Sequence, residues 1–505
     1  MKKVLYILSA LLLLAACRPD PVDDPVNVPL EVDTDMISFT AEGGEQTFTA
    51  TASEKIFLVP GEDWVKARQG EKSPDNKVQV TVTVEANDSF EERSTRISVV
   101  AGEEKLYVEV TQEAKTFVPD PEPVPGDNTA WKIAEKLGIG WNLGNQMDAH
   151  INGVSDETCW GNPKTTKALF DWLKEYGFKS VRIPVTWMGH VNGAPYFTID
   201  EDWMNRVAEI VGYAEQAGLN AIINMHHDGA DSNYWLDIKT AAVNPQIHAE
   251  ITDQFSKMWA QIAERFKDKG DYLIFESFNE IHDGGWGWGS NRNDSGKQYQ
   301  CLNEWNQAFV DAVRGTGGEN ADRLLAVAGY CANPDMTIEH LVLPDDTAEG
   351  RLMVAVHCYD PYDYCLAAKY SEWGHTGAVG KKDPNANEAT LESTFSKLKK
   401  AYIDKGIPVY MGEMGCVNRA SSRDQAFQQY YLEYFAKAAK TYGVAPFIWD
   451  NGASGTGEER HAFIDHATGM YCSDGAKAAI EAFLRGVNKE DADYTLKAVY
   501  DSAPM

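Results

Sequence analysis

Two glutamates in this chain each stand at the end of an apolar run. Glu280 closes the run Asp-Tyr-Leu-Ile-Phe-Glu-Ser-Phe-Asn-Glu, and Glu413 closes the run Ile-Pro-Val-Tyr-Met-Gly-Glu. Both runs have the composition of buried parallel strands, whose carboxyl ends collect catalytic groups in alternating strand–helix folds. Two carboxylates that reach one opening from different strands can divide acid and base work between them. The pair therefore predicts hydrolysis of glycosidic bonds.

Residues 129–505 alternate strand-like and helix-like patterns, as a barrel requires. The strand candidates are Gly138–Leu143, Ser180–Val185, Asn220–His226, Tyr272–Asn279, Leu324–Gly329, Met353–His357, Val409–Glu413 and Pro446–Trp449. Amphipathic helical patterns follow nearly all of them, for example Asp200–Ala217 with Asp200 as the expected N-cap. Eight such units over about 375 residues predict a (β/α)8 TIM barrel with its chemistry on the βα loops. A doubly wound sheet is disfavoured because no G-x-G-x-x-G turn follows the first strand.

Polar or aromatic side chains stand at the ends of nearly all these strands. They are Asn142, Arg182, His226, His227, Asn279, Glu280, His357, Tyr359, Glu413 and Trp449. A single histidine at such a place is more often structural than catalytic. The whole set in eightfold order is hard to reach by chance, so we expect one shared cleft.

Short motifs carry these residues: Trp141-Asn-Leu-Gly-Asn145, Val181-Arg-Ile-Pro184, Asn224-Met-His-His227, Phe278-Asn-Glu280, His357-Cys-Tyr359, Gly412-Glu413 and Trp449. Together they resemble glycoside hydrolase family 5 over essentially the whole of residues 129–505. The runs from His226 to Gly229 and from His357 to Pro361 resemble its subfamily 4, the endo-β-glucanase and xyloglucanase group. Ile281 departs conservatively from the proline or valine that usually follows Asn-Glu in the family.

The resemblance implies roles for the two glutamates. Glu280 would be the acid/base, which protonates the leaving oxygen and later deprotonates water. Glu413 would be the nucleophile that forms a glycosyl-enzyme, and Arg182 and Tyr359 would keep it ionised. A retaining mechanism of this kind predicts carboxyl groups about 5–5.5 Å apart, against roughly 6.5–9.5 Å for inversion.

The resemblance also implies a substrate-binding set around that pair. Asn279 would bind the sugar 2-hydroxyl, and Trp449 would form the floor under the −1 sugar. His226 and His357 would line the cleft with His227 as a supporting neighbour, and Asn142 is a further candidate.

A glycine-rich run, Asp283-Gly-Gly-Trp-Gly-Trp-Gly289, follows Glu280 closely. It could be a flexible loop with incidental tryptophans. We favour the interpretation that Trp286 and Trp288 stack on glucosyl or xylosyl units, because large exposed aromatic side chains beside a cleft are costly without a ligand. Trp187 and Trp235 lie in other βα loops and are weaker candidates.

The composition narrows the possible partners. The 505 residues predict two folded units plus a tail, and 43% hydrophobic content allows a large core. Lys and Arg total 46 against 76 Asp and Glu, a formal charge of −30, so nucleic acid is disfavoured as a partner. Apart from Cys17, seven cysteines remain without zinc-type pairing, which indicates buried thiols. We expect no metal and no cofactor.

The N-terminus has the pattern of a lipoprotein signal. Lys2 and Lys3 precede an apolar run of about 11 residues, too short for a bilayer span of roughly 20. The run ends Leu14-Ala-Ala-Cys17, which resembles a bacterial lipobox with cleavage leaving a lipidated Cys17. Residues 1–17 are then the signal and 18–30, rich in Pro and Asp, a disordered tether. Acidic residues behind Cys17 resemble surface-export signals of Bacteroidota lipoproteins, so we expect a lipid anchor in the outer membrane and cell-surface exposure.

Residues 31–114 have a different pattern. Runs such as Val78–Val84 and Lys105–Val110 alternate with period two between glycine turns, which predicts a small antiparallel, immunoglobulin-like β-sandwich. Trp64 and the closing Val110-Thr-Gln112 resemble a BACON-type module, for which we favour a spacer role over glycan binding. The proline-alternating segment within 115–128 predicts a stiff linker to the second domain.

Three alternatives remain open. A β-mannanase or mixed-linkage β-glucanase would share these residues, because they do not distinguish the C2 hydroxyl configuration. A non-catalytic surface glycan-binding protein is disfavoured because both Glu280 and Glu413 are present. A metal-dependent barrel hydrolase is suggested by the adjacent histidines, but such barrels usually carry H-x-H after the first strand. The favoured substrate is a plant cell-wall β-1,4-glucan, with xyloglucan first, cut internally.

Overall fold

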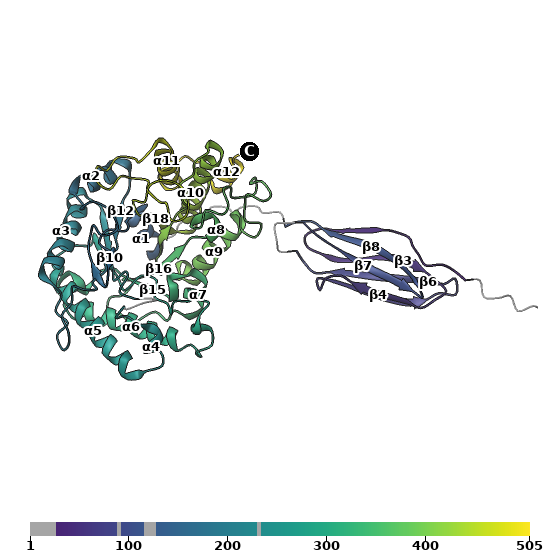
Figure 1. Cartoon of the computed structure of the whole chain (residues 1–505), viewed down its shortest axis with the longest axis horizontal. Helices are drawn as coiled ribbons and strands as arrows, with labels where there is room; N and C mark the ends of the chain where they lie inside the picture. The colour runs from purple at the N-terminus through teal and green to yellow at the C-terminus, as the bar shows by residue number, and fades with distance from the viewer. Residues whose placement is uncertain (1–26, 88–91, 116–127, 230–233) are drawn as a thin grey trace, which may run out of the picture. The chain divides into compact units, whose positions relative to one another are not determined.

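The computed structural model describes residues 27–87, 92–115, 128–229 and 234–505 (Figure 1). The chain forms two compact units, Met1–Phe117 and Val118–Met505. The signal segment with Cys17 and most of the tether and linker lie outside the described residues. Within the described part of the chain, no helix is long and apolar enough to cross a bilayer.

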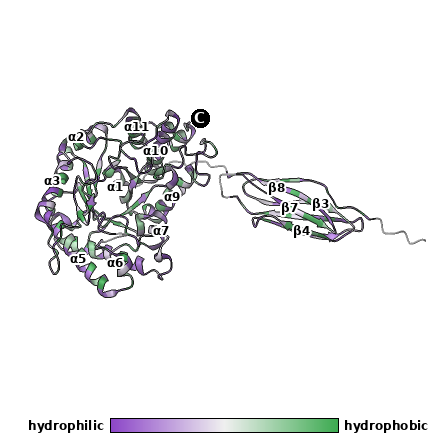
Figure 2. Ribbon diagram, viewed as in Figure 1, coloured by the Kyte–Doolittle hydropathy of each residue, from purple (hydrophilic) through white to green (hydrophobic). Residues whose placement is uncertain are grey.

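The first unit is a β-sandwich of two four-stranded sheets with the strand orders β1-β3-β6-β5 and β2-β8-β7-β4. The strands are β1 (Glu31–Val32), β2 (Met36–Phe39), β3 (Gly44–Thr51), β4 (Ile56–Pro60), β5 (Val65–Lys72), β6 (Lys77–Val84), β7 (Arg93–Ala101) and β8 (Glu104–Gln112). Hydrophobic and hydrophilic residues alternate along them (Figure 2), and the buried set includes Val80, Val82, Ile97 and Val108. The predicted sandwich is confirmed, except that β2 pairs with β8 in parallel.

The second unit is a closed parallel barrel in the order β12-β13-β14-β15-β16-β17-β18-β9. Its strands are β9 (Gly140–Leu143), β12 (Ser180–Ile183), β13 (Asn220–Ile223), β14 (Leu273–Glu276), β15 (Leu325–Ala328), β16 (Leu352–Cys358), β17 (Val409–Met414) and β18 (Val444–Asp450). Six of the eight are buried at every residue, and β13 and β16 each begin with one half-buried residue, as expected for strands enclosed on both faces. All eight predicted strands are confirmed.

Four strands, β12, β13, β14 and β15, end earlier than the sequence predicts, and the early end of β14 affects the position of Glu280. β14 stops at Glu276, and Glu280 lies four residues beyond it. The intervening backbone leaves the regular ladder, since Ser277 N donates to Ala326 O and Asn279 N donates to Met225 O, both at 2.9 Å. These two bonds still tie the segment to the neighbouring strand ends, so Glu280 reaches the same face of the barrel.

Helices surround the barrel (Figure 1). They are α1 (Thr129–Leu137), α2 (Lys167–Tyr176), α3 (Glu201–Ala217), α4 (Ile238–Ala241), α5 (Pro245–Arg265), α6 (Lys297–Arg314), α7 (Pro334–His340), α8 (Tyr362–Cys365), α9 (Glu388–Ala401), α10 (Ser422–Tyr442), α11 (Asp474–Asn488) and α12 (Leu496–Asp501). A small hairpin, β10 (His150–Ile151) and β11 (Val154–Ser155), lies in the loop after β9. The predicted cap is confirmed, because the Asp200 side chain accepts from Trp203 N at 3.0 Å.

The seven cysteines of the described chain are all free thiols. Cys301, Cys331, Cys358, Cys365 and Cys416 are buried. The prediction of buried thiols therefore holds for these five, while Cys159 is half-buried and Cys472 is exposed.

Candidate active site

The two predicted carboxylates meet at one end of the barrel. One oxygen of Glu280, one oxygen of Glu413 and one ring nitrogen of His357 lie within 4.8 Å of one another. His357 Nδ1 is 2.7 Å from Glu280 Oε1 and 3.7 Å from Glu413 Oε2. This carboxylate spacing is below the roughly 6.5 Å lower limit typical of inverting glycosidases.

A fully buried guanidinium organises the floor of the site. Arg182, in β12, donates Nη1–H to Glu413 Oε1 at 2.6 Å and Nη2–H to Asn279 Oδ1 at 2.8 Å. Its other side makes a two-point pair with Glu276, at 2.8 and 2.9 Å. Burial alone would lower the pKa of Arg182, but the charges of Glu276 and Glu413 outweigh it and raise that pKa well above its ordinary value. The cation is therefore permanent.

The second oxygen of Glu413 is held by a phenol. Tyr359 donates its hydroxyl hydrogen to Glu413 Oε2 at 3.0 Å. Burial and then the charge of Glu413 raise the pKa of Tyr359 well above its ordinary value, so the phenol keeps this proton. Both oxygens of Glu413 thus accept hydrogen bonds, which favours the ionised carboxylate.

Two histidines in the site have opposite electrostatic surroundings. Burial opposes protonation of His357, but the charge of Glu413 and the hydrogen bond to Glu280 raise its pKa above the ordinary value. Burial, followed by the charges of His227 and Arg182, lowers the pKa of His226 well below its ordinary value. His226 is therefore a neutral wall of the site, whereas the carboxylates around His357 favour its protonated form.

Trp449 lies beside His226 with parallel rings, 6.0 Å between centroids and 3° between planes. Gly144, from the first motif, leaves room for the indole, because a Cβ there would lie 2.8 Å from Trp449 Cζ2 and 2.7 Å from Asp450 O. His227 packs edge-on against His226 at 4.4 Å between centroids. The placement of these three aromatic groups matches the predicted cleft.

Asn142 does not lie where the sequence analysis expects it. It has no exposed surface, and its amide donates to Gly412 O and Ile448 O while its oxygen accepts from Arg182. All its polar atoms are engaged within the protein, so direct substrate binding by Asn142 is wrong.

Arg182 is equally buried and acts only through Glu413 and Asn279. The oxygen of Asn279 points to Arg182, which directs its amide N–H groups away from that cation.

A cellulase model of glycosyl hydrolase family 5 matches residues 144–455. The chain belongs to glycoside hydrolase family 5. The BACON model, described as a putative N-terminal binding domain, matches residues 52–113 of the same chain. The resemblance seen in the sequence motifs is thereby confirmed for both parts.

Relatives of this family 5 enzyme are endoglucanases. It is 31% identical over 474 residues to a xyloglucan-specific endo-β-1,4-glucanase of Bacteroides ovatus, with 90% of each chain covered. A broad-specificity endoglucanase structure from Bacteroides salanitronis is 55% identical, with a TM-score of 0.70 over 74% of this chain and 99% of that one. A Bacteroides ovatus family 5 xyloglucanase in complex with a XXXG heptasaccharide has a TM-score of 0.64 at 30% identity, covering 91% and 100%. The family 5 enzyme is a glycoside hydrolase of the endo-β-1,4-glucanase group.

The loop after Glu280 is held in place by one carboxylate. Asp283 accepts hydrogen bonds from Gly285 N, Ser290 Oγ and Asn291 N, at 3.0, 2.6 and 3.2 Å. These hydrogen bonds connect both ends of the glycine-rich run to one side chain.

The two loop tryptophans of the family 5 enzyme are exposed. Trp286 is 57% exposed and packs against His282 at 4.1 Å between centroids. Trp288 is 76% exposed and has the Arg292 guanidinium 3.8 Å from its ring on one face. The weaker candidates differ: Trp187 has no exposed surface, and the indole of Trp235 donates to Asp228. Trp187 as a sugar platform is therefore wrong.

Several site residues were missed from the sequence. Glu276 pairs with Arg182 and also accepts the Tyr410 hydroxyl hydrogen, and Asn224 contacts His226 Nδ1 at 3.1 Å. The available signal was a charged residue inside the otherwise apolar strand Leu-Ile-Phe-Glu. His150 and Trp160 pack against His227, and Tyr234 packs against His150, in an aromatic group that no sequence motif marked.

Within the described ranges of the chain, two groups have a ligand composition that a metal could use. One is the catalytic set Glu280, His357 and Glu413, and the other is Asp148, His226 and His227. In the second group, Asp148 already accepts from Asn145 N and Gln146 N, at 3.1 and 2.8 Å. The donor atoms of this second group lie within 4.8 Å of one another, and His227 Nε2 is 3.6 Å from Asp148 Oδ2.

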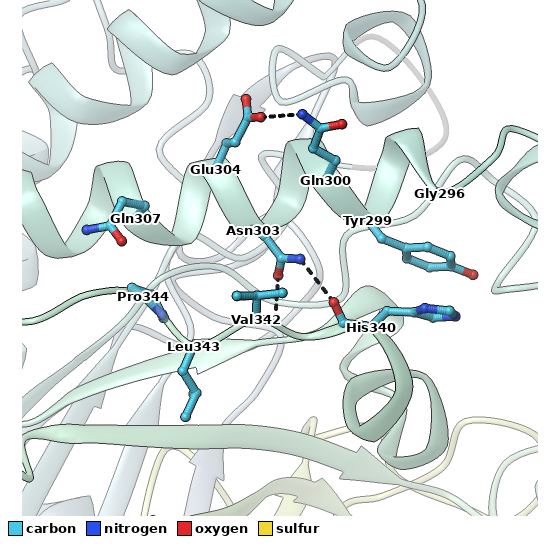
Figure 3. A pocket seen from close by; sticks show the side chains of 10 residues that line it. All are labelled: Gly296, Tyr299, Gln300, Asn303, Glu304, Gln307, His340, Val342, Leu343 and Pro344. Atoms are coloured by element: carbon cyan, nitrogen blue, oxygen red, sulfur yellow. Dashed lines mark hydrogen bonds between the residues drawn. The ribbon is translucent and has the colours of Figure 1, made fainter.

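A cavity of about 470 Å³ lies elsewhere, between α6 and residues 340–344 (Figure 3). Tyr299 and His340 stack at one end of it, 3.7 Å between centroids. Asn303 closes its floor, donating to His340 O and accepting from Val342 N. None of the residues that line this cavity belongs to the group at the strand ends that contains Glu280, His357 and Glu413. The cavity is therefore separate from the active site of the family 5 enzyme.

Proposed function

We propose that this enzyme is a retaining endo-β-1,4-glucanase whose preferred substrate is xyloglucan. The observation that carries the mechanism is the short separation of Glu280 and Glu413, whose surroundings differ in charge. Glu413 accepts from a permanent cation and a phenol, whereas the Glu280 carboxylate has a hydrogen bond to His357 and to no other residue in the described part of the chain. Unequal surroundings of this kind separate a nucleophile from an acid/base.

In the first step, a Glu413 oxygen attacks the anomeric carbon and forms a glycosyl ester. The bond from that carbon to the glycosidic oxygen breaks, and Glu280 transfers its proton to the leaving oxygen. Glu413 loses its charge in this step, so the hydrogen bonds from Arg182 and Tyr359 weaken. These donors then favour the return of the carboxylate in the second step.

In the second step, Glu280, now ionised, takes a proton from water, and the water oxygen adds to the anomeric carbon. The ester bond to Glu413 breaks and the sugar leaves with its original anomeric configuration. His357 Nδ1 lies 2.7 Å from Glu280 Oε1, where an N–H at this nitrogen would donate to the ionised carboxylate. Asn279 offers its amide N–H groups to the sugar 2-hydroxyl, and Trp449 lies under the −1 ring.

Two observations support xyloglucan over unbranched glucan. The Bacteroides ovatus relatives that cover most of this chain are described as xyloglucanases, one in complex with a XXXG heptasaccharide. The loop near Glu280 also presents Trp286 and Trp288 to solvent, as platforms for xylose-substituted glucosyl units.

The test is hydrolysis of a polysaccharide panel: xyloglucan, carboxymethyl cellulose, barley mixed-linkage glucan and galactomannan. We expect the highest kcat/KM on xyloglucan, a rapid fall in polymer size, and a β-anomeric product that NMR detects before mutarotation. Higher activity on galactomannan or barley glucan would support the alternative substrates, and an initial α-anomer would reject the retaining mechanism.

We also propose that the enzyme works as an outer-membrane lipoprotein at the cell surface. Support comes from the lipobox ending at Cys17 and from the acidic residues behind it. The sandwich of residues 31–114 would then act as a spacer between the anchored end and the catalytic barrel.

A further inference from the structure

A second cavity, of about 210 Å³, lies among the loops that follow β17 and β18 and the start of α11. That volume is several times the roughly 30 Å³ that one water molecule occupies in the liquid. Among the described residues that line it none is acidic, although the chain has 76 Asp and Glu against 46 Lys and Arg. In so acidic a protein, a cavity free of carboxylates that contains an arginine requires an explanation.

The arginine is Arg419, which is 8% exposed. Its Nη2 donates to Tyr364 O at 2.6 Å, and its guanidinium carbon is 4.4 Å from the centre of the Tyr364 ring. Its buried Nε has no hydrogen-bond partner, and no described carboxylate forms an ion pair with it. An unpaired charge with an unsatisfied N–H is costly to bury.

Another buried arginine shows how this chain satisfies a guanidinium without a carboxylate. Arg323 is 2% exposed and donates to the side-chain oxygen of Asn320 and to the carbonyls of Gly270, Leu273, Phe266 and Lys269. Arg419 has no comparable cage of acceptors. Arg419 is one of the described residues that line the cavity, and it is the only charged residue among them.

The start of α11 supplies further donors to the same cavity. This helix has 15 residues, and Ser473 and Gly475 from its first turn line the cavity. A helix N-terminus presents free backbone N–H groups and a partial positive charge, which favour anions. A Cβ on Gly475 would lie 3.0 Å from Gln425 Nε2, so the glycine keeps this side open. Asp474 lies in the same turn but does not line the cavity.

We propose that this cavity binds a tetrahedral oxyanion, phosphate or sulfate, between Arg419 and the first turn of α11. The hydroxyls of Ser454 and Thr456, which also line the cavity, would complete the donor set. The anion would hold the loop after β17 against the loop after β18. Because these loops follow Glu413 and Trp449, its effect would be to stabilise the face of the barrel that carries the site.

The experiment measures the Tm of the full chain against sulfate and phosphate concentration, with sodium chloride at matched ionic strength as the reference. Sulfate stabilises many proteins non-specifically, so the readout is the difference between wild type and Arg419→Gln. We expect a saturable rise on the order of 3 °C in wild type that Arg419→Gln loses. Arg423→Gln, on the adjoining α10 and paired with Glu372, is the matched control and should retain the rise.

A second variant and a second measurement make the result independent of any folding defect in Arg419→Gln. Gly475→Val keeps the charge of Arg419 but places a side chain in the cavity at the first turn of α11. This variant should also lose the rise in Tm. Selenate soaked into crystals should give an anomalous peak beside Arg419. The same measurement with glucose 6-sulfate distinguishes a free anion from a sulfate ester carried by a sugar. A Tm rise as large as that with free sulfate would assign the site to the sugar-borne ester. Equal salt responses in all variants, or selenate only at other places, would overturn the proposal.

Discussion

Glu276 and Arg182 form a buried ion pair with two parallel hydrogen bonds, and neither side chain has exposed surface. Burial raises the pKa of Glu276, but Arg182 outweighs it and lowers that pKa below its ordinary value. The pair fixes the guanidinium so that its remaining N–H groups face Glu413 and Asn279. Glu276 is therefore a positioning residue that acts on the reaction through Arg182.

Replacing this carboxylate should affect catalysis more than binding. In Glu276→Gln, Arg182 loses its two-point anchor, and we expect kcat to fall by about 100-fold with little change in KM, because the nucleophile is misplaced in the transition state. Breaking a buried pair should also cost about 3–5 kcal/mol of stability. Steady-state kinetics on a soluble aryl cellobioside and urea unfolding measure the two effects.

Glu157→Gln is the matched control for this variant. Glu157 is also nearly buried and pairs at two points with Arg206, at 2.8 and 2.9 Å, and Arg206 makes no hydrogen bond to Glu280 or Glu413. We expect it to lose stability and keep kcat. Equal losses of kcat in the two variants would show that Glu276 matters only for stability.

The roles of the two carboxylates are separable by rescue with azide. Glu413→Ala should lose on the order of 10⁴-fold or more of kcat, and azide entering from the vacated side should restore turnover with an α-glycosyl azide product. Glu280→Ala should still form the glycosyl-enzyme from a substrate with a good leaving group, and azide should then give a β-glycosyl azide. Exchange of the two product configurations between the variants would reverse the assignments.

The barrel was predictable because its strands are short, apolar and evenly separated by amphipathic helices. Each of the eight candidate strands contains or overlaps the strand in the structure, and Asp200 caps α3 as its sequence predicts. The catalytic pair was predictable because Glu280 and Glu413 each follow a buried strand at one end of a parallel barrel. Local pattern and barrel topology therefore suffice for these two residues.

The parts that the sequence did not predict depend on which way a buried side chain points. Asn142 ends a strand like its neighbours, yet it faces Arg182 and two backbone carbonyls instead of the cleft. Glu276 was hidden within an apolar run, because a strand pattern does not show that a cation from β12 lies opposite. Trp187 lies in a βα loop but packs in the core, since loop position does not determine exposure.

Trp288 should bind the polymer and not the reacting sugar. With 76% of its surface exposed, Trp288→Ala should leave folding intact and raise KM for xyloglucan about 10-fold, while kcat/KM for a short aryl glycoside stays unchanged. Trp172→Ala is the control, because Trp172 on α2 is 38% exposed and stacks on Tyr176, outside the strand-end cluster. Similar KM values for Trp288→Ala and Trp172→Ala would remove the loop from the binding site.

Membrane attachment should depend on one thiol. Cys17→Ser should abolish lipid attachment, so that metabolic labelling with radioactive palmitate is lost and the protein leaves the membrane fraction. Catalytic activity of the released protein should be unchanged, since the barrel does not include this segment. In wild-type cells, added protease should remove the enzyme from intact cells; resistance to protease would contradict surface exposure.

His461 should make the fold sensitive to acid. It is fully buried, neither ring nitrogen has a hydrogen-bond partner in the described structure, and burial followed by the charge of Arg419 lowers its pKa to about 3. Because this folded-state pKa lies below the unfolded value of about 6.5, the unfolded chain binds the proton first as the pH falls. The stabilisation is complete above about pH 6.5 and is lost at up to about 1.4 kcal/mol per pH unit between there and pH 3. His226, with its pKa also lowered, contributes in the same direction.

His461→Phe should reduce the fall in the free energy of unfolding with decreasing pH, measured by urea unfolding at pH 7.5, 6.0 and 4.5. His340→Phe, at a partly exposed site, should keep the wild-type pH dependence. An unchanged slope in His461→Phe would show that other groups cause the acid sensitivity.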